Sequence, residues 1–170
     1  MKKVTIIAGF TFLLFVSNAF AQAKTIVGVA AGNDDFSTLV TAVKAADLVE
    51  TLSGEGPFTV FAPTNDAFEK LPDGTVAGLL EPDSKDALTG VLTYHVVAGE
   101  YDAAAVMKAI EDNNGKFTAK TVQGGEIVLS ISNGNVSLTD EKGNSSTVIM
   151  ADVDASNGVI HAIDAVVMPQ

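Results

Sequence analysis

The chain has no cysteine, no arginine and only two histidines among its 170 residues. Without thiols it cannot form disulfides, thiolate metal sites or thiol active sites, so packing must stabilise its core. Arginine supplies most bidentate contacts to phosphates and base edges, so its absence argues against nucleic acid as a partner. A zinc site needs three or four ligands at fixed spacing, which two histidines and scattered carboxylates do not provide. We therefore expect no metal and no cofactor.

Charge of one sign dominates the composition. Twenty-one acidic residues outweigh ten lysines, which gives a formal net charge of −11. Loss of an N-terminal leader that contains Lys2 and Lys3 but no acid would bring this value to −13. Scattered surface acids commonly serve solubility, and an acidic binding face is the alternative interpretation.

The N-terminus has the organisation of a cleavable signal peptide over residues 1–21. Lys2 and Lys3 precede an apolar run from Val4 to Val16, and Ala19 to Ala21 forms an Ala-x-Ala site. The apolar run is shorter than the roughly 20 residues that a membrane anchor needs, which favours cleavage after Ala21. We expect a secreted or periplasmic protein with no membrane span after cleavage, and the short lysine-containing leader is typical of bacteria.

Residues 24–170 contain no internal repeat and no Pro-rich linker, so we expect one domain. In its first half, Asp34 or Asp35 can cap a helix with Phe36, Leu39, Val40 and Val43 on one face, and Asp47 can cap a second. Further helices are predicted at Asn65 to Leu71 with Thr64 as the cap, at Thr75 to Leu80, at Asp83 to Val91, and after Asp102 with Val106, Met107 and Ile110 inward.

Strands are interleaved with these helices and dominate the second half. Alternating apolar residues and the turn pair Asn133-Gly134 predict a tight hairpin around Ile131 and Val136. Other strands are predicted at Phe58 to Ala62, Leu92 to Val97, Thr147 to Asp152 and Val159 to Met168. Helices first, then an antiparallel β half, indicate an α+β domain.

Three segments carry a resemblance to a known family. Gly56 to Phe68 (GPFTVFAPTNDAF), Leu92 to Val97 (LTYHVV) and Asn157 to Val167 (NGVIHAIDAVV) resemble the first box, the central Tyr-His motif and the second box of the fasciclin (FAS1) domain. The motifs follow the family's order and span most of the predicted mature chain. The resemblance implies a wedge of β-sheets with several short helices packed along one side, used for extracellular adhesion and matrix association.

The same resemblance marks candidate partner-binding residues. In animal matrix members, an Asp-Ile pair before the second box and the Tyr-His region are linked to integrin binding. The matching residues are Asp152 and Val153, and Tyr94 and His95. Ala151 stands where those members have Pro, and Val153 replaces Ile, so the match marks a contact surface without naming its partner.

The remaining polar candidates are interpreted as structural. His95 and His161 lie among apolar residues, where an imidazole must find internal hydrogen-bond partners, so both are expected to be buried anchors. No Gly-x-Ser-x-Gly motif or carboxylate pair singles out a catalytic group, so no enzyme is predicted. Asp152 is expected at a strand end, separable from folding, and Asp140 in the hairpin region is expected to tolerate substitution.

These observations favour a secreted or periplasmic adhesion module that binds a protein or polysaccharide of a surface or matrix. The alternative is a carrier of an apolar small molecule such as a carotenoid or lipid, since some FAS1-like proteins are carriers. A single module binds weakly, so adhesion would depend on multivalent display or self-association.

Overall fold

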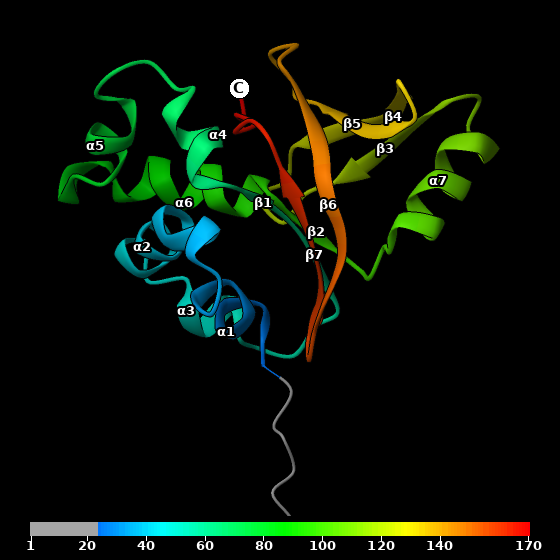
Figure 1. Ribbon diagram of the computed structural model, residues 1–170. Helices are drawn as coiled ribbons and strands as arrows, with labels where there is room; N and C mark the ends of the chain where they lie inside the picture. The colour runs from blue at the N-terminus through cyan, green and yellow to red at the C-terminus, as the bar shows by residue number, and fades with distance from the viewer. Residues whose placement is uncertain (1–23) are drawn as a thin grey trace, which may run out of the picture.

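The computed structural model describes residues 24–170, and the predicted signal peptide lies outside the described residues. A seven-stranded sheet forms the body of a wedge, with helices α1 to α6 along one side and α7 on the other (Figure 1). The described chain starts at the narrow end of the wedge and finishes at the broad end. The predicted α+β wedge with short helices along one side is confirmed.

The elements have the following bounds. The helices are α1 (Ile26–Ala31), η1 (Asp34–Phe36), α2 (Ser37–Ala45), α3 (Val49–Leu52), α4 (Asn65–Glu69), α5 (Thr75–Leu79), η2 (Pro82–Ser84), α6 (Lys85–Tyr94) and α7 (Ala103–Asp112). The strands are β1 (Phe58–Pro63), β2 (Val96–Ala98), β3 (Lys116–Lys120), β4 (Glu126–Ser132), β5 (Asn135–Thr139), β6 (Ser145–Ala155) and β7 (Gly158–Ile163).

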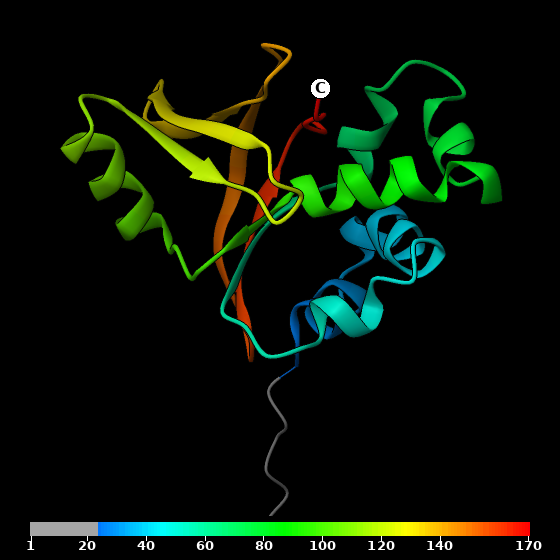
Figure 2. The same cartoon turned by 180° about the vertical axis from the view of Figure 1, so that it is seen from behind.

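The sheet has the order β2-β1-β7-β6-β5-β4-β3, and only its β1–β7 pair is parallel among the described strands. The sheet curls so strongly that its two edges meet. Val97 of β2 forms a bridge with Thr121 just after β3, and the Val122 amide donates to the Val96 carbonyl at 2.7 Å. Figure 2 shows the same curled sheet from behind, with α7 beside β3 and β4.

Two hydrophobic cores share the β1–β7 pair as a common wall. Val60 and Ile160 point into the helical core, which the apolar faces of α1 to α6 fill. Phe61 and Ile163 point the other way, into a core that α7 and the curled strands enclose. Because side chains alternate along a strand, a strand buried on both faces carries apolar residues at successive positions, as β1 and β7 do.

Two predicted caps are confirmed and two are wrong. Thr64 accepts the Ala67 amide at 3.4 Å, and Asp102 accepts the Ala105 amide at 2.6 Å. The cap before α2 is not Asp34 or Asp35, because Asn33 accepts the Asp35 amide and starts η1 instead. Asp47 does not cap α3; its backbone is left-handed, with φ 55°, and the helix starts after Leu48.

Other sequence predictions need correction. The strand predicted at Leu92 to Val97 is helical up to Tyr94, because Leu88, Val91 and Leu92 form one buried helical face. Met107 is 42% exposed, since α7 buries only Val106 and Ile110 fully. The last strand ends at Ile163 rather than Met168.

Gly158 allows β7 to pair closely with β1, and this requirement can be tested. A Cβ on Gly158 would overlap the Phe58 carbonyl on the adjacent β1. We expect Gly158→Ala to lower the free energy of unfolding by more than about 3 kcal/mol, since backbone cannot move aside as a side chain can. Gly90→Ala in α6 is the matched control, because nothing lies within 4 Å of its added Cβ. Urea denaturation should show this variant unchanged or stabilised by up to about 1 kcal/mol, and equal losses in both variants would contradict the close-packing argument.

Candidate binding surface

Tyr94 is fully buried and its hydroxyl is shared between two segments of the sheet. The hydroxyl donates to the Glu126 carbonyl at 2.6 Å and accepts the Glu141 amide at 3.2 Å. Burial raises the pKa of the phenol above its ordinary value. The side chain thus joins the end of α6 to β4 and to the β5–β6 connection, and it presents no surface to a partner.

His95 caps α6 and is 2% exposed. Its Nδ1 donates to the Val91 carbonyl at 2.7 Å, and its Nε2 accepts the Val167 amide at 3.2 Å. The carbonyl can only accept and the amide can only donate, so these partners define the neutral tautomer. Burial lowers the pKa of His95 to about 4, while the Val91 carbonyl and Asp140 act in the opposite direction.

His161 on β7 is likewise 2% exposed, and its ring stacks on Phe61 with centroids 5.7 Å apart. Its Nε2 donates to the Tyr101 carbonyl at 2.8 Å, and its Nδ1 accepts the Asp152 amide at 3.3 Å. Both histidines are therefore buried anchors, as their apolar surroundings predict. With both ring nitrogens occupied, neither imidazole has a free nitrogen for a metal ion or for proton transfer.

Within residues 24–170, no three or more His, Asp or Glu side chains are grouped so that they could hold a metal ion. No helix in this range has the length and apolar character needed to cross a membrane.

Asp152 is exposed, but it has a structural contact that the sequence does not reveal. It lies within β6 rather than at its end, in a left-handed conformation with φ 58°. Its Oδ1 accepts the amide of Ala103, the first residue of α7, at 2.7 Å. Val153 is half-buried and packs against the helical core. Of the four candidate residues, only Asp152 presents an exposed side chain, and this side chain also holds α7.

Asp140 is not the neutral position that its place near a hairpin suggests. The residue is 5% exposed, and its carboxylate accepts the amides of Lys142, Asn144 and Met168 at 2.8–3.0 Å. It therefore organises the β5–β6 turn and attaches the C-terminal segment to it. The prediction that Asp140 tolerates substitution is wrong for this reason, because a buried carboxylate with three amide donors is costly to remove.

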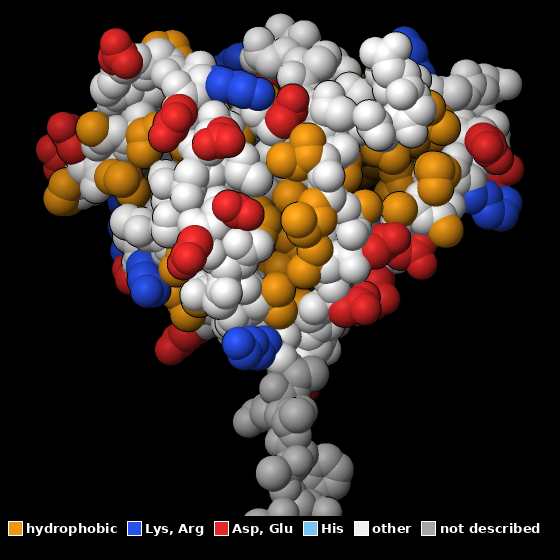
Figure 3. Space-filling model, in the orientation of Figure 1, with side chains coloured by type: hydrophobic (Ala, Val, Ile, Leu, Met, Phe, Trp, Pro, Cys, Tyr) orange, Lys and Arg blue, Asp and Glu red, His pale blue; other side chains and the backbone are white. Residues whose placement is uncertain are grey.

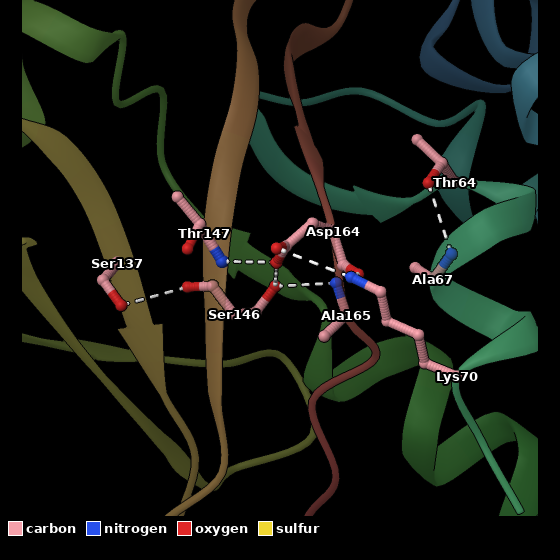
Figure 4. A network of polar contacts seen from close by, with 8 residues as sticks. All are labelled: Thr64, Ala67, Lys70, Ser137, Ser146, Thr147, Asp164 and Ala165. Atoms are coloured by element: carbon pink, nitrogen blue, oxygen red, sulfur yellow. Dashed lines mark hydrogen bonds and ion pairs between the residues drawn. The ribbon is translucent and has the colours of Figure 1, made fainter.

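A second polar network fixes the start of β6 (Figure 4). The Asp164 carboxylate accepts the Thr147 amide at 2.7 Å and the Ser146 hydroxyl at 3.2 Å. Lys70 at the end of α4 donates to the Asp164 carbonyl at 2.6 Å, and its Nζ lies 3.6 Å from the Asp164 carboxylate. The network explains why the last strand ends at Ile163, and it holds β6 against the helical layer.

Two large apolar side chains follow this network on β6 and face solvent. Ile149 is 58% exposed and Met150 is 48% exposed. The ladder between β6 and β7 shifts register between Val148 and Met150, so the alternation of buried and exposed positions is interrupted there. Figure 3 shows hydrophobic side chains gathered in a column on this face, with acidic side chains to either side.

An open hollow of about 210 Å³ adjoins Ile149, and Asp35, Thr64, Asn65 and Asp66 also line it. We call Ile149, Met150, Asp35 and Asp66 the β6 surface. The sequence prediction missed it, because Asp35 is interpreted there only as a possible helix cap and Asp66 only as part of the first family motif. The run Val148 to Met150 does contain a signal, since three successive apolar residues in a strand of period two cannot all point to one core.

The apolar cavities are too small for a bound carotenoid or lipid. A cavity of about 30 Å³ lies between α1, α2 and β1 beside His95, and one of about 10 Å³ lies between α7 and β6. Small-molecule sites typically measure about 300 to 1,000 Å³. A wider hollow of about 410 Å³ at the narrow end of the wedge is open and lined mostly by glycine and polar or charged residues. None of these three hollows is a preformed apolar site of the required size.

The fold is an α+β wedge in which the polar motif residues Tyr94, His95 and His161 are all buried. The fasciclin domain model matches residues 34–169, and the chain belongs to the fasciclin domain family. Protein sll1483 of Synechocystis sp. is 56% identical over 148 residues, which cover 87% of this chain and 75% of that protein.

Animal proteins are also similar to this chain. The transforming growth factor-beta-induced protein ig-h3 of Sus scrofa is 37% identical over 85% of this chain, but only 19% of its own length is matched. The solved FAS1 domain pair of the insect cell adhesion molecule fasciclin I superposes with a TM-score of 0.75 at 20% identity, over 85% of this chain and 51% of that one. The insect structure thus shares the fold.

The buried His95 predicts acid sensitivity. The unfolded chain protonates this imidazole near pH 6.5 but the folded protein only near pH 4, so the unfolded state binds more protons in between. Stability contributed by His95 is present above pH 6.5 and is lost as the pH falls toward 4, by up to about 3 kcal/mol. Unfolding free energies of the wild type and His95→Gln should therefore differ less at pH 4 than at pH 7. An imidazole signal of His95 that titrates near pH 6.5 in the folded protein would contradict this.

Asp152 should contribute to stability despite its exposure. Asp152→Ala removes the acceptor for the Ala103 amide and places alanine at a positive φ, for an expected loss of about 1 to 2 kcal/mol. The matched control is Asp154→Ala on the same strand, which is exposed and should change stability by less than about 0.5 kcal/mol. Thermal and urea unfolding measure both, and equal stability of the two variants would show that the contact with α7 is unimportant.

Proposed function

We propose that this chain is an exported, non-catalytic adhesion module that binds a surface or matrix protein through the β6 surface. The observation that carries the proposal is the exposure of Ile149 and Met150 side by side on β6. Large apolar side chains that face solvent together are typical of interaction sites. We favour a protein over a polysaccharide, because Ile149 and Met150 offer apolar area at the centre of this surface.

Three further lines of argument support the proposal. Fasciclin domains are associated with cell adhesion, and the chain belongs to that family. The predicted signal peptide would deliver a domain made of residues 24–170 to the periplasm or the cell exterior, where such partners occur. Both histidines are closed off by internal hydrogen bonds, which leaves the exterior as the place for function. No structural observation favours the carrier alternative.

Adhesion through this surface would be weak for one copy of the protein. A patch with two large apolar side chains at its centre is small compared with interfaces that bind tightly as single copies. Clustered display would raise the overall avidity without new contacts. The assay should therefore present many copies together.

The test uses beads coated with purified protein and allowed to attach to the surface of the producing cells. We expect Ile149→Ser combined with Met150→Ser to reduce attachment at least about fivefold, and to leave unfolding nearly unchanged because both side chains are exposed. Ile131→Ser is the matched control, since Ile131 is an exposed isoleucine on β4, which β5 separates from β6 in the sheet. Attachment of the double variant at the wild-type level would refute a role for β6.

Asp152→Asn tests the contact role that the family resemblance assigns to Asp152 and Val153. The amide oxygen can still accept the Ala103 amide, so this change removes the charge and retains the hold on α7. Reduced attachment with unchanged stability would extend the contact region along β6 to Asp152. Unchanged attachment would confine the binding region to Ile149 and Met150.

A further inference from the structure

We infer that the partner presents a lysine or arginine side chain within an apolar segment, and that this side chain enters the hollow between Asp35 and Asp66. The inference rests on the proposed function and specifies the chemistry of the partner. Its basis is charge complementarity beside an uncovered apolar strip. The hollow of about 210 Å³ borders Ile149 directly, so a single binding segment can reach both.

The polar side chains that line the hollow divide into two groups. Asn65 is committed to the fold, because its Oδ1 accepts the Thr38 amide at 3.0 Å and its Nδ2 donates to the Asp34 carbonyl at 2.8 Å. The Thr64 hydroxyl already accepts the Ala67 amide as the cap of α4. The carboxylates of Asp35 and Asp66 have no hydrogen-bond or ion-pair partner among the described residues. They are the groups that remain for a ligand.

The fold leaves this negative charge uncompensated where a local pair would be expected. Lys70 follows Asp66 by four residues, the spacing at which an acid and a lysine normally pair along a helix. Lys70 instead donates to the Asp164 carbonyl, as Figure 4 shows. A cation from outside the chain can therefore take the place that Lys70 does not fill.

Ile149 supplies the second half of the recognition. Lysine and arginine carry three or four methylene groups below the charged head, and these groups are buried favourably against an apolar wall. With 58% of its surface exposed, Ile149 offers that wall, and Met150 continues it for an apolar neighbour in the segment. A second copy of this chain is a poor occupant, because its formal net charge, −11 for the whole chain and −13 without the leader, repels the same surface.

The test measures binding of a labelled ten-residue peptide of alternating lysine and valine by fluorescence anisotropy. The comparison peptides alternate glutamate with valine and lysine with serine. At an ionic strength of about 0.02 M we expect the lysine–valine peptide to bind wild type more tightly than either comparison peptide, and raising the ionic strength to about 0.3 M should weaken it. Equal binding of the glutamate–valine peptide would overturn the inference.

Paired variants separate the hollow from the overall charge. Asp35→Asn with Asp66→Asn should weaken binding of the lysine–valine peptide at least about fivefold, since two exposed charge pairs are lost. Asp83→Asn with Glu111→Gln removes the same total charge from other exposed positions and should change binding less than about twofold. Equal losses in the two double variants would show a net-charge effect and overturn the site. Melting curves verify that each variant is folded.

This test and the bead assay can fail separately. In one result, bead attachment requires Ile149 and Met150 but is unaffected by Asp35→Asn with Asp66→Asn. That result would preserve the adhesion proposal and overturn the cationic partner. The opposite result is that peptide binding depends on Asp35 and Asp66 while bead attachment does not depend on Ile149 and Met150. That result would preserve the cation site and overturn adhesion through β6.

Discussion

The parallel pairing of β1 with β7 is the constraint on which the rest of this structure depends. It joins Phe58 to Gly158 at one end and Pro63 to Ile163 at the other, segments that are 100 residues apart in the chain. Both strands are buried on both faces, so the helical layer and the curled sheet can each use the pair as a wall. Gly158 makes the approach to Phe58 feasible, because the two backbones leave no room for a side chain.

The exposed part of β6 follows from its pairing with this wall. Between Val148 and Ala155, β6 has eight residues opposite the six of β7, so two must leave the ladder, and the register shifts twice. The first shift lies at Ile149. The second shift includes Asp152, whose backbone is left-handed and whose amide donates to Nδ1 of His161. The exposed part of β6 is thus a product of strand mismatch, which His161 on β7 and Asp164 just after β7 hold in place.

The sequence predicted the elements whose signals are local. The caps Thr64 and Asp102 act through amides three residues away, and the hairpin turn at Asn133 has the positive φ that its Asn-Gly pair favours. It failed where distant residues decide the outcome. Leu92 was assigned to a strand because its neighbours are β-formers, but the helical core determines its conformation. The role of Asp140 is only partly local, because its carboxylate accepts amides two and four residues away but also the Met168 amide, 28 residues away.

The same division separates the residues that make the fold from those available for recognition. The polar residues of the motifs, Tyr94, His95 and His161, form hydrogen bonds only within the protein. The motifs therefore identify the fold without specifying a partner. Ile149 and Met150 lie outside all three motifs, and their exposure costs no internal contact. Substitutions at these two exposed positions should therefore change stability little. Asp152 is the exception, because its carboxylate both faces solvent and holds α7, so a change there also affects the stability of the fold.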